Sequence, residues 1–192
     1  MSRRLVEPLP PRPVSGGEPV AAVVALGANL GDRAATLAAA ADDLRRLPLV
    51  DEVVVSPAVE TVALKPDGPD ADAPAYLNAV ALVTTRLAPT VLLGFLLAIE
   101  KAHGRARPST GSGSGAGSGS GVSGLAWADR TLDLDLIAYG DVRSDAGDLT
   151  LPHPRAHERA FVLEPWLTVD PDAALPGRGR VDALLARLRG RS

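Results

Sequence analysis

Apolar and polar residues follow two periods along the chain, about two residues in strands and about 3.6 residues in helices. The strand-like segments are rich in β-branched residues or alternate regularly, and they cover residues 19–27, 50–62, 76–87 and 130–140. The helix-like segments cover residues 29–47, 89–104 and about 181–190. Pro57 lies within the second strand-like segment. It indicates an edge strand or a bulge, because proline cannot donate to a sheet ladder.

The order of the elements before residue 149 is strand, helix, strand, strand, helix, strand. This βαββαβ order predicts an α+β, ferredoxin-like fold, in which a four-stranded antiparallel sheet carries both helices on one face. A C-terminal extension of short helices and turns follows.

A run of glycine and serine at residues 109–124 has the composition of a flexible linker. It does not separate two domains, because the piece after it would hold a single long strand with little to pair against. We therefore expect one domain over residues 20–192, with a flexible insertion at 109–124 that is poorly ordered without substrates. Residues 1–19, rich in proline and polar groups, are expected to be a disordered tail.

Composition narrows the classes of function. The formal net charge of −3 and the aromatic content of 3% give no reason to expect nucleic-acid binding. The chain has no cysteine and no apolar run long enough for a membrane span, which fits a cytoplasmic protein. We expect a monomer.

Asp133 and Asp135 are the most informative pair of polar residues. Side chains alternate along a strand, so Leu134 and its leucine neighbours should lie under the helices while both carboxylates project from the opposite, uncovered face. Adjacent carboxylates repel unless a cation lies between them, and Mg²⁺ held by one or two carboxylates usually accompanies a phosphate-bearing substrate. A solvated strand face remains an alternative for this motif alone.

Tyr76 and Asn78 are also two residues apart on a predicted strand and should share one face, the same open face as the aspartates. A tyrosine ring beside an amide can hold a flat heteroaromatic ligand by stacking and paired hydrogen bonds. A surface tyrosine and a strand-end asparagine are the simpler alternative.

Cationic residues border the Gly/Ser run on both sides. Glu100 ends the second helix and is followed by Arg105 and Arg107. Trp127 and Arg130 lie after the run, where the chain should become ordered again. Guanidinium groups that close over a charged substrate suit phosphoryl transfer. Ordinary solvated arginines are the alternative.

The segment LPHPRAHERAF supplies further polar groups: His153, His157, Arg159 and Phe161. Two histidines four residues apart beside prolines are weak evidence for a metal site, and contacts to phosphate explain them as well.

Together these motifs resemble the 6-hydroxymethyl-7,8-dihydropterin pyrophosphokinase family of folate biosynthesis. The resemblance runs over about residues 20–171 and rests on ALGANLGDR, YLNAV, IE with GRAR, RTLDLDLIAYG and LTLPHPRAHERAFVLEP. It implies transfer of pyrophosphate from ATP to the hydroxymethyl group of the pterin, with release of AMP.

The resemblance also implies a role for each matching residue. Asp133 and Asp135 match metal ligands for two Mg²⁺ ions on ATP, and with Arg105 and Arg130 they form the expected catalytic set. Tyr76 and Phe161 match rings that stack on the pterin, and Asn78 matches an amide at its edge. The other positions expected near ATP or the closed site are Glu100, Arg107, Trp127, Thr150, His153 and Arg159.

Three features depart from the family pattern. A Thr-Pro-Pro segment is replaced by residues 61–64, which leaves contacts from Thr61 and Leu64 to the pterin possible but puts the stiffness of the loop in question. Leu97 replaces a polar residue near ATP, and the Gly/Ser run lengthens the active-site loop. Two other classes stay open on the residues alone: a ligand-binding module without catalysis, and nucleic-acid binding through the sheet, which composition disfavours.

Overall fold

The computed structural model of the chain describes residues 17–65, 68–70, 75–104, 131–147 and 149–190. Most of the predicted tail, the whole Gly/Ser run and the residues on both sides of that run lie outside this part of the chain. The expectation that the run is poorly ordered therefore stays a prediction.

Strands and helices follow the predicted order. The strands of the main sheet are β1 (Val20–Ala28), β2 (Val50–Val55), β3 (Val59–Thr61), β6 (Tyr76–Thr85) and β7 (Asp133–Tyr139). Three small hairpins pair β4 (Ala63–Lys65) with β5 (Gly68–Asp70), β8 (Ser144–Ala146) with β9 (Leu149–Leu151), and β10 (Ala174–Leu175) with β11 (Gly179–Arg180). The helices are α1 (Arg33–Arg45), α2 (Pro89–His103), α3 (Ala160–Val169) and α4 (Val181–Arg189), with a 3₁₀ turn at Ala156–Glu158.

The main sheet has the strand order β2-β6-β1-β7, and each neighbouring pair is antiparallel. β3 pairs with β6 beyond the end of β2, so the segment predicted as one strand is split around Pro57 at the sheet edge. Ser56 explains the break: its backbone N–H donates to the Val80 carbonyl, but its hydroxyl, in place of a carbonyl, accepts the Val80 N–H at 2.9 Å.

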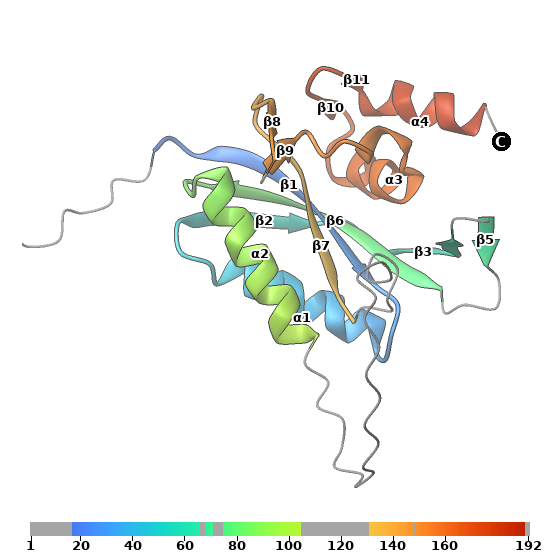
Figure 1. Ribbon diagram of the computed structural model, residues 1–192, viewed down its shortest axis with the longest axis horizontal. Coiled ribbons are helices and arrows are strands. Elements are labelled where there is room, and N and C mark those ends of the chain that lie inside the picture. The colour runs from blue at the N-terminus through green and yellow to red at the C-terminus, as the bar shows by residue number, and fades with distance from the viewer. Residues whose placement is uncertain (1–16, 66–67, 71–74, 105–130, 148, 191–192) are drawn as a thin grey trace, which may run out of the picture.

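Helices cover both faces of the sheet (Figure 1), and an apolar layer lies between the sheet and each pair of helices. α1 and α2 pack on one face over a core that includes Leu134 and Leu136 of β7, as the leucine alternation predicts. α3 and α4 pack on the other face around Ile137. The fold is therefore α+β, an antiparallel sheet with helices. No helix within the described residues combines the length and apolar character needed to cross a bilayer.

The sequence suggested that the second face of the sheet is uncovered. In the structure, α3 and α4 cover part of it. Ile137 is fully buried there by the C-terminal extension, while Asp133 and Asp135 are only half-buried. A β-bulge lies where β7 changes from half-buried to fully buried on this face. Val24 pairs with Leu136 and Val23 pairs with Ala138, so β7 has one extra residue at this point. The extension covers the bulged end of β7 and leaves the end with the carboxylates accessible.

Candidate active site

The register of three strands places one row of residues across the second face. Gly27 of β1 pairs with Asn78 of β6 on one side and with Asp133 of β7 on the other. Gly27 has no side chain to separate them, and a Cβ placed on it would lie 3.3 Å from the Asn78 Oδ1 atom. The glycine therefore lets the Asn78 amide lie close to the β1 backbone and places no side chain between this amide and the Asp133 carboxylate, and a glycine inside a strand often marks such a close approach.

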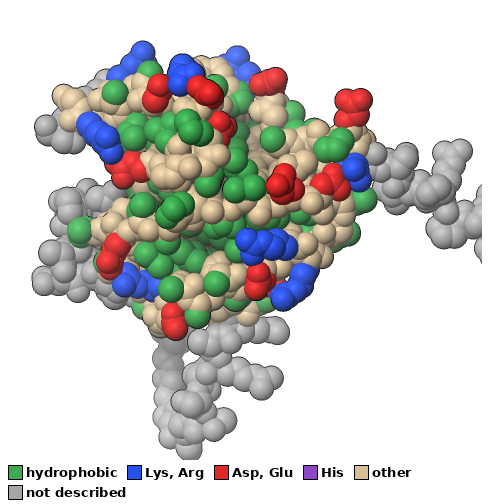
Figure 2. Space-filling model, turned by 180° about the vertical axis from the view of Figure 1, so that it is seen from behind, with side chains coloured by type: hydrophobic (Ala, Val, Ile, Leu, Met, Phe, Trp, Pro, Cys, Tyr) green, Lys and Arg blue, Asp and Glu red, His purple; other side chains and the backbone are tan. Residues whose placement is uncertain are grey.

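The adjacent row links this row to the core under α3. Ala25 pairs with Val80 and with Asp135, and both apolar residues belong to the layer packed against α3 and α4. Asp135 thus lies at the border between the buried and accessible parts of the face. Seen from behind, the described surface has acidic and basic side chains interspersed around apolar side chains, and it shows no single basic area (Figure 2).

Arg159 and His153 bring positive or donor groups to Asp135. The Arg159 Nη1 atom donates to Asp135 Oδ2 at 2.7 Å, and the His153 Nε2 atom is 3.9 Å from the same oxygen. The Arg159 guanidinium carbon also lies 5.6 Å from the centre of the Phe161 ring. Arg159 ends the 3₁₀ turn and precedes α3, so one short segment carries both the cation and the ring.

The orientation of His153 follows from its other ring nitrogen. The backbone N–H of Arg155 donates to His153 Nδ1 at 3.3 Å, so the neutral ring carries its proton on Nε2, toward Asp135. Burial lowers the pKa of His153, and the carboxylate of Asp135 opposes that shift. The residue therefore favours the neutral form, a hydrogen-bond donor on the side of the carboxylates.

Glu100 supports β7 between the two aspartates. Its Oε1 atom accepts the backbone N–H of Leu134 at 2.7 Å, from the last turn of α2 to the sheet edge. This contact satisfies a donor of an edge strand and fixes the segment that holds both carboxylates. The predicted contact of Glu100 with ATP stays a prediction.

The residues expected around the pterin meet at the start of β6. Tyr76 pairs with Thr61 of β3, and the buried Asn78 donates from Nδ2 to the Thr61 hydroxyl at 2.8 Å. α3, which carries Phe161, packs against β6 and touches β3. Leu64 lies in β4, but its side chain is outside what the structure describes.

Thr150 is the remaining predicted site residue that the structure describes. Thr150 is exposed on β9 and pairs with Asp145 of β8. The residues that border the Gly/Ser run are outside the described residues: Arg105, Arg107, Trp127 and Arg130. Their roles stay predictions. His157, for which the sequence allows a metal or a phosphate contact, lies 3.6 Å from the Glu158 carboxylate.

Sequence reasoning missed two residues, Gly27 and Arg33. A glycine inside an otherwise apolar strand is a signal of close approach by a ligand or another chain segment. An arginine at the first position of a helix opposes the helix dipole and so calls for another explanation.

Asp133 and Asp135 suit a metal ion that takes some of its ligands from the protein and the others from a substrate. Within the described residues no three histidine or acidic side chains gather into a complete protein cage. Mg²⁺ needs only one or two carboxylates when phosphate oxygens and water fill the remaining positions. The Arg159 guanidinium, bonded to Asp135, already shows that a cation fits beside this carboxylate.

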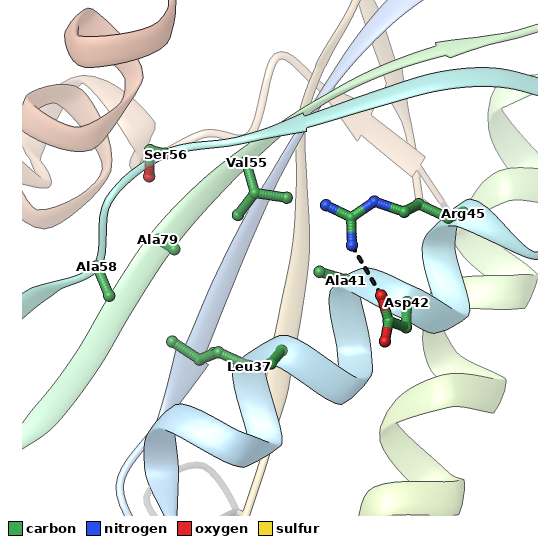
Figure 3. Close-up of a pocket in the computed structure, with 9 residues that line it drawn as sticks. Leu37, Ala41, Asp42, Arg45, Val55, Ser56, Ala58 and Ala79 are labelled. Carbon is green, nitrogen blue, oxygen red and sulfur yellow. Dashed lines mark hydrogen bonds and ion pairs between the residues drawn. The ribbon is translucent and has the colours of Figure 1, made fainter.

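A separate cavity lies on the opposite face, between α1 and the β2–β3 edge (Figure 3). Leu37 and Ala41 of α1 face Val55 across it, and the ion pair between Asp42 and Arg45 closes at 2.8 Å on its rim. Its lining is mostly apolar and contains none of the predicted site residues. It is not the site formed by the carboxylates.

The family model and the similar sequences point to the same family. A model of the family described as 7,8-dihydro-6-hydroxymethylpterin-pyrophosphokinase matches residues 23–171. A Pseudomonas aeruginosa protein named 2-amino-4-hydroxy-6-hydroxymethyldihydropteridine pyrophosphokinase is 39% identical over 163 residues, 85% of this chain and 88% of that protein. A Schizosaccharomyces pombe folic acid synthesis protein is 30% identical over 155 residues, 81% of this chain and 18% of that protein.

Comparison with solved structures supports the fold. A Plasmodium falciparum HPPK-DHPS crystal structure matches with a TM-score of 0.62 at 12% identity. The match covers 93% of this chain and 47% of that chain, so the present chain corresponds to about half of the longer protein.

Proposed function

The chain belongs to the 7,8-dihydro-6-hydroxymethylpterin-pyrophosphokinase family, and we propose that it transfers pyrophosphate from ATP to 6-hydroxymethyl-7,8-dihydropterin. The hydroxymethyl oxygen forms a bond to the β-phosphorus of ATP. The bond from that phosphorus to the oxygen bridging the α-phosphate breaks, AMP leaves with this oxygen, and the hydroxyl proton passes to solvent or a phosphate. The name of the S. pombe relative supports a place in folate biosynthesis.

The observation that carries the proposal is the row formed by Asn78, Gly27 and Asp133. A pterin needs hydrogen-bonding groups at its edge, and the phosphates of ATP need cations beside it. The row supplies an amide at one end and a carboxylate at the other that could bind a metal, with no side chain on Gly27 between them. Substrates held on this row would have the hydroxymethyl group and the phosphates side by side, and such positioning accounts for much of phosphoryl-transfer catalysis.

Asp133 and Asp135 would hold two Mg²⁺ ions together with oxygens of ATP. When bound, these ions would neutralise the triphosphate and orient it for in-line attack. Arg159 and His153 already lie beside the Asp135 carboxylate, and from there they would donate to phosphate oxygens at that end of the site. A dedicated base is unnecessary where the hydroxyl proton leaves late in a loose transition state.

The fold is consistent with this assignment. The strand order and antiparallel pairing support the ferredoxin-like arrangement, with α1 and α2 on one face. The C-terminal extension adds Phe161 and Arg159 from the other face, which a bare βαββαβ unit would lack.

The test is formation of AMP from ATP by the purified full chain, with Mg²⁺ and 6-hydroxymethyl-7,8-dihydropterin. We expect AMP to appear in equal amounts with pyrophosphorylated pterin, measured by chromatography. Omission of the pterin is the control, because simple ATP hydrolysis would continue without it. A folded protein that binds the pterin but forms no AMP would be a binding module, and the proposal would be wrong.

Arg159→Ala should tighten the binding of Mg²⁺ to the nucleotide-free protein by up to about fivefold. The guanidinium competes for Asp135, and a partly exposed ion pair contributes about 0.2–1 kcal/mol. The same change should lower kcat/KM by about tenfold, because a charge-assisted donor to phosphate is lost. Calorimetric titration with Mg²⁺ and steady-state kinetics measure the two effects.

Arg178→Ala is the matched control for Arg159→Ala, because Arg178 is exposed on the C-terminal extension. It should leave both the Mg²⁺ affinity and the rate unchanged. Weaker or equal Mg²⁺ binding in Arg159→Ala would show that the guanidinium does not compete with the metal.

A further inference from the structure

Arg33 joins three segments of the chain at one point. It is the first residue of α1, and its Nη1 atom donates to the Glu60 carboxylate of β3 at 2.9 Å. The same nitrogen donates to the backbone carbonyl of Ala75, directly before β6. The side chain is about two-thirds buried, with 31% of its surface exposed.

The stability of α1 does not account for an arginine at this position. A cation at the first turn of a helix opposes the positive end of the helix dipole. The helix is already capped by Asp32, whose carboxylate accepts the Ala35 N–H at 3.0 Å. The benefit of Arg33 must therefore come from its contacts with β3 and with Ala75.

Those contacts lie one residue away from two groups of the pterin site. Glu60 precedes Thr61, Ala75 precedes Tyr76, and Thr61 pairs with Tyr76 in the sheet. Glu60 pairs with Leu77, whose side chain packs toward α1 and α2, so the Arg33 contacts lie on the helix-covered face.

The opposite face has its own link between the same strands. There the Asn78 Nδ2 atom donates to the Thr61 hydroxyl at 2.8 Å. The end of β3 and the start of β6 are thus joined by side-chain contacts on both faces of the sheet. One of these contacts uses the Asn78 amide, which is expected to bind the pterin. Binding of the pterin would therefore break the hydrogen bond from Asn78 to Thr61. The Arg33 link remains when Asn78 turns to the ligand.

We propose that Arg33 is a positioning residue for the pterin subsite, a role that rests on the proposed function. It holds β3 against the start of β6, so that Tyr76 and Thr61 keep their places while Asn78 exchanges its partner for the pterin. The carboxylates that bind the metal and ATP are on β7, which Arg33 does not touch. Its effect should therefore be confined to the pterin.

Kinetics of Arg33→Ala test this separation. We expect KM for the pterin to rise about tenfold, since a charged donor to the partly buried Ala75 carbonyl is lost, while kcat and KM for ATP change less than about twofold. Arg33→Lys keeps a charged donor and should recover part of the loss. Glu60→Gln keeps an acceptor and should raise KM for the pterin only about two- to threefold. Arg45→Ala is the control: it removes an arginine and its ion pair from the far end of the same helix.

Three further measurements separate positioning from general destabilisation and from failure of the proposed function. Fluorescence titration gives Kd for the pterin without turnover, and thermal melts show whether each variant folds. Hydrogen exchange of peptides covering residues 59–61 and 76–78 should be faster in Arg33→Ala than in the native chain. Equal losses for ATP and the pterin, or an unchanged Kd for the pterin, would overturn the inference. A native chain that binds the pterin without forming AMP would refute the proposed function, while the change in Kd would still decide the role of Arg33.

Discussion

Asp133→Asn and Asp135→Asn should each lower the rate of AMP formation by about 1,000-fold or more. Each substitution keeps the size of the side chain and its place on β7 but removes a negative charge that a metal ion requires. Metal ions contribute several kcal/mol of charge stabilisation in a transition state, and each 1.36 kcal/mol corresponds to about tenfold in rate. The loss should appear in kcat as well as in kcat/KM.

Asp135→Asn should also change the protein before any substrate is added. Asp135 forms an ion pair with Arg159, so its replacement leaves this half-buried guanidinium without the carboxylate it contacts at 2.7 Å. We therefore expect Asp135→Asn to lower the melting temperature of the ligand-free protein below that of the native chain.

Steady-state assays and melting with Mg²⁺ plus α,β-methylene-ATP measure both parts of this prediction. The analogue should stabilise the native chain by mass action and should stabilise neither variant. Asp141→Asn is the matched control, because Asp141 lies in the exposed turn after the same strand. Retention of a third or more of the native rate by Asp133→Asn would contradict its role as a metal ligand.

Local periodicity predicted the contents of β7 but not its surroundings. The alternation of leucine and aspartate follows from strand geometry alone, and Leu134 and Asp133 do face opposite layers. The bulge at Ile137 and the helices over it could not be predicted, because they depend on pairing with β1 and on packing by a segment beyond residue 159. Covering of the second face is therefore a property of tertiary structure.

The same limit applies to the site. Alternation along each strand placed Asp133 and Asn78 on the same open face of the sheet, and the family resemblance placed them in one site. Their place in a single row depends on register across β1, which periodicity does not determine. The support of β7 by Glu100 is likewise a contact between a helix end and a strand 34 residues away in the chain.

Gly27→Val should lower kcat/KM by about 100-fold and leave the protein folded. Gly27 lies between Asn78 and Asp133, and a Cβ there would already meet Asn78 Oδ1 at 3.3 Å. Valine suits a strand, so the backbone can accept it, but its methyl groups would fill the space proposed for the substrates. A displacement of about 1 Å in reacting groups can cost about 100-fold in rate.

A graded series distinguishes obstruction of the site from damage to the sheet. Gly27→Ala should have an intermediate effect, because Asn78 needs to move by only a few tenths of an ångström. Ala21→Val introduces the same side chain at an exposed position on the same face of β1 and should leave kinetics unchanged. Kd for the pterin and kcat/KM should worsen in the order Gly, Ala, Val, while circular dichroism stays the same. If Gly27→Val bound the pterin as tightly as the native chain, the space between Asn78 and Asp133 would not be the substrate site, since a ligand and a valine side chain cannot both occupy it.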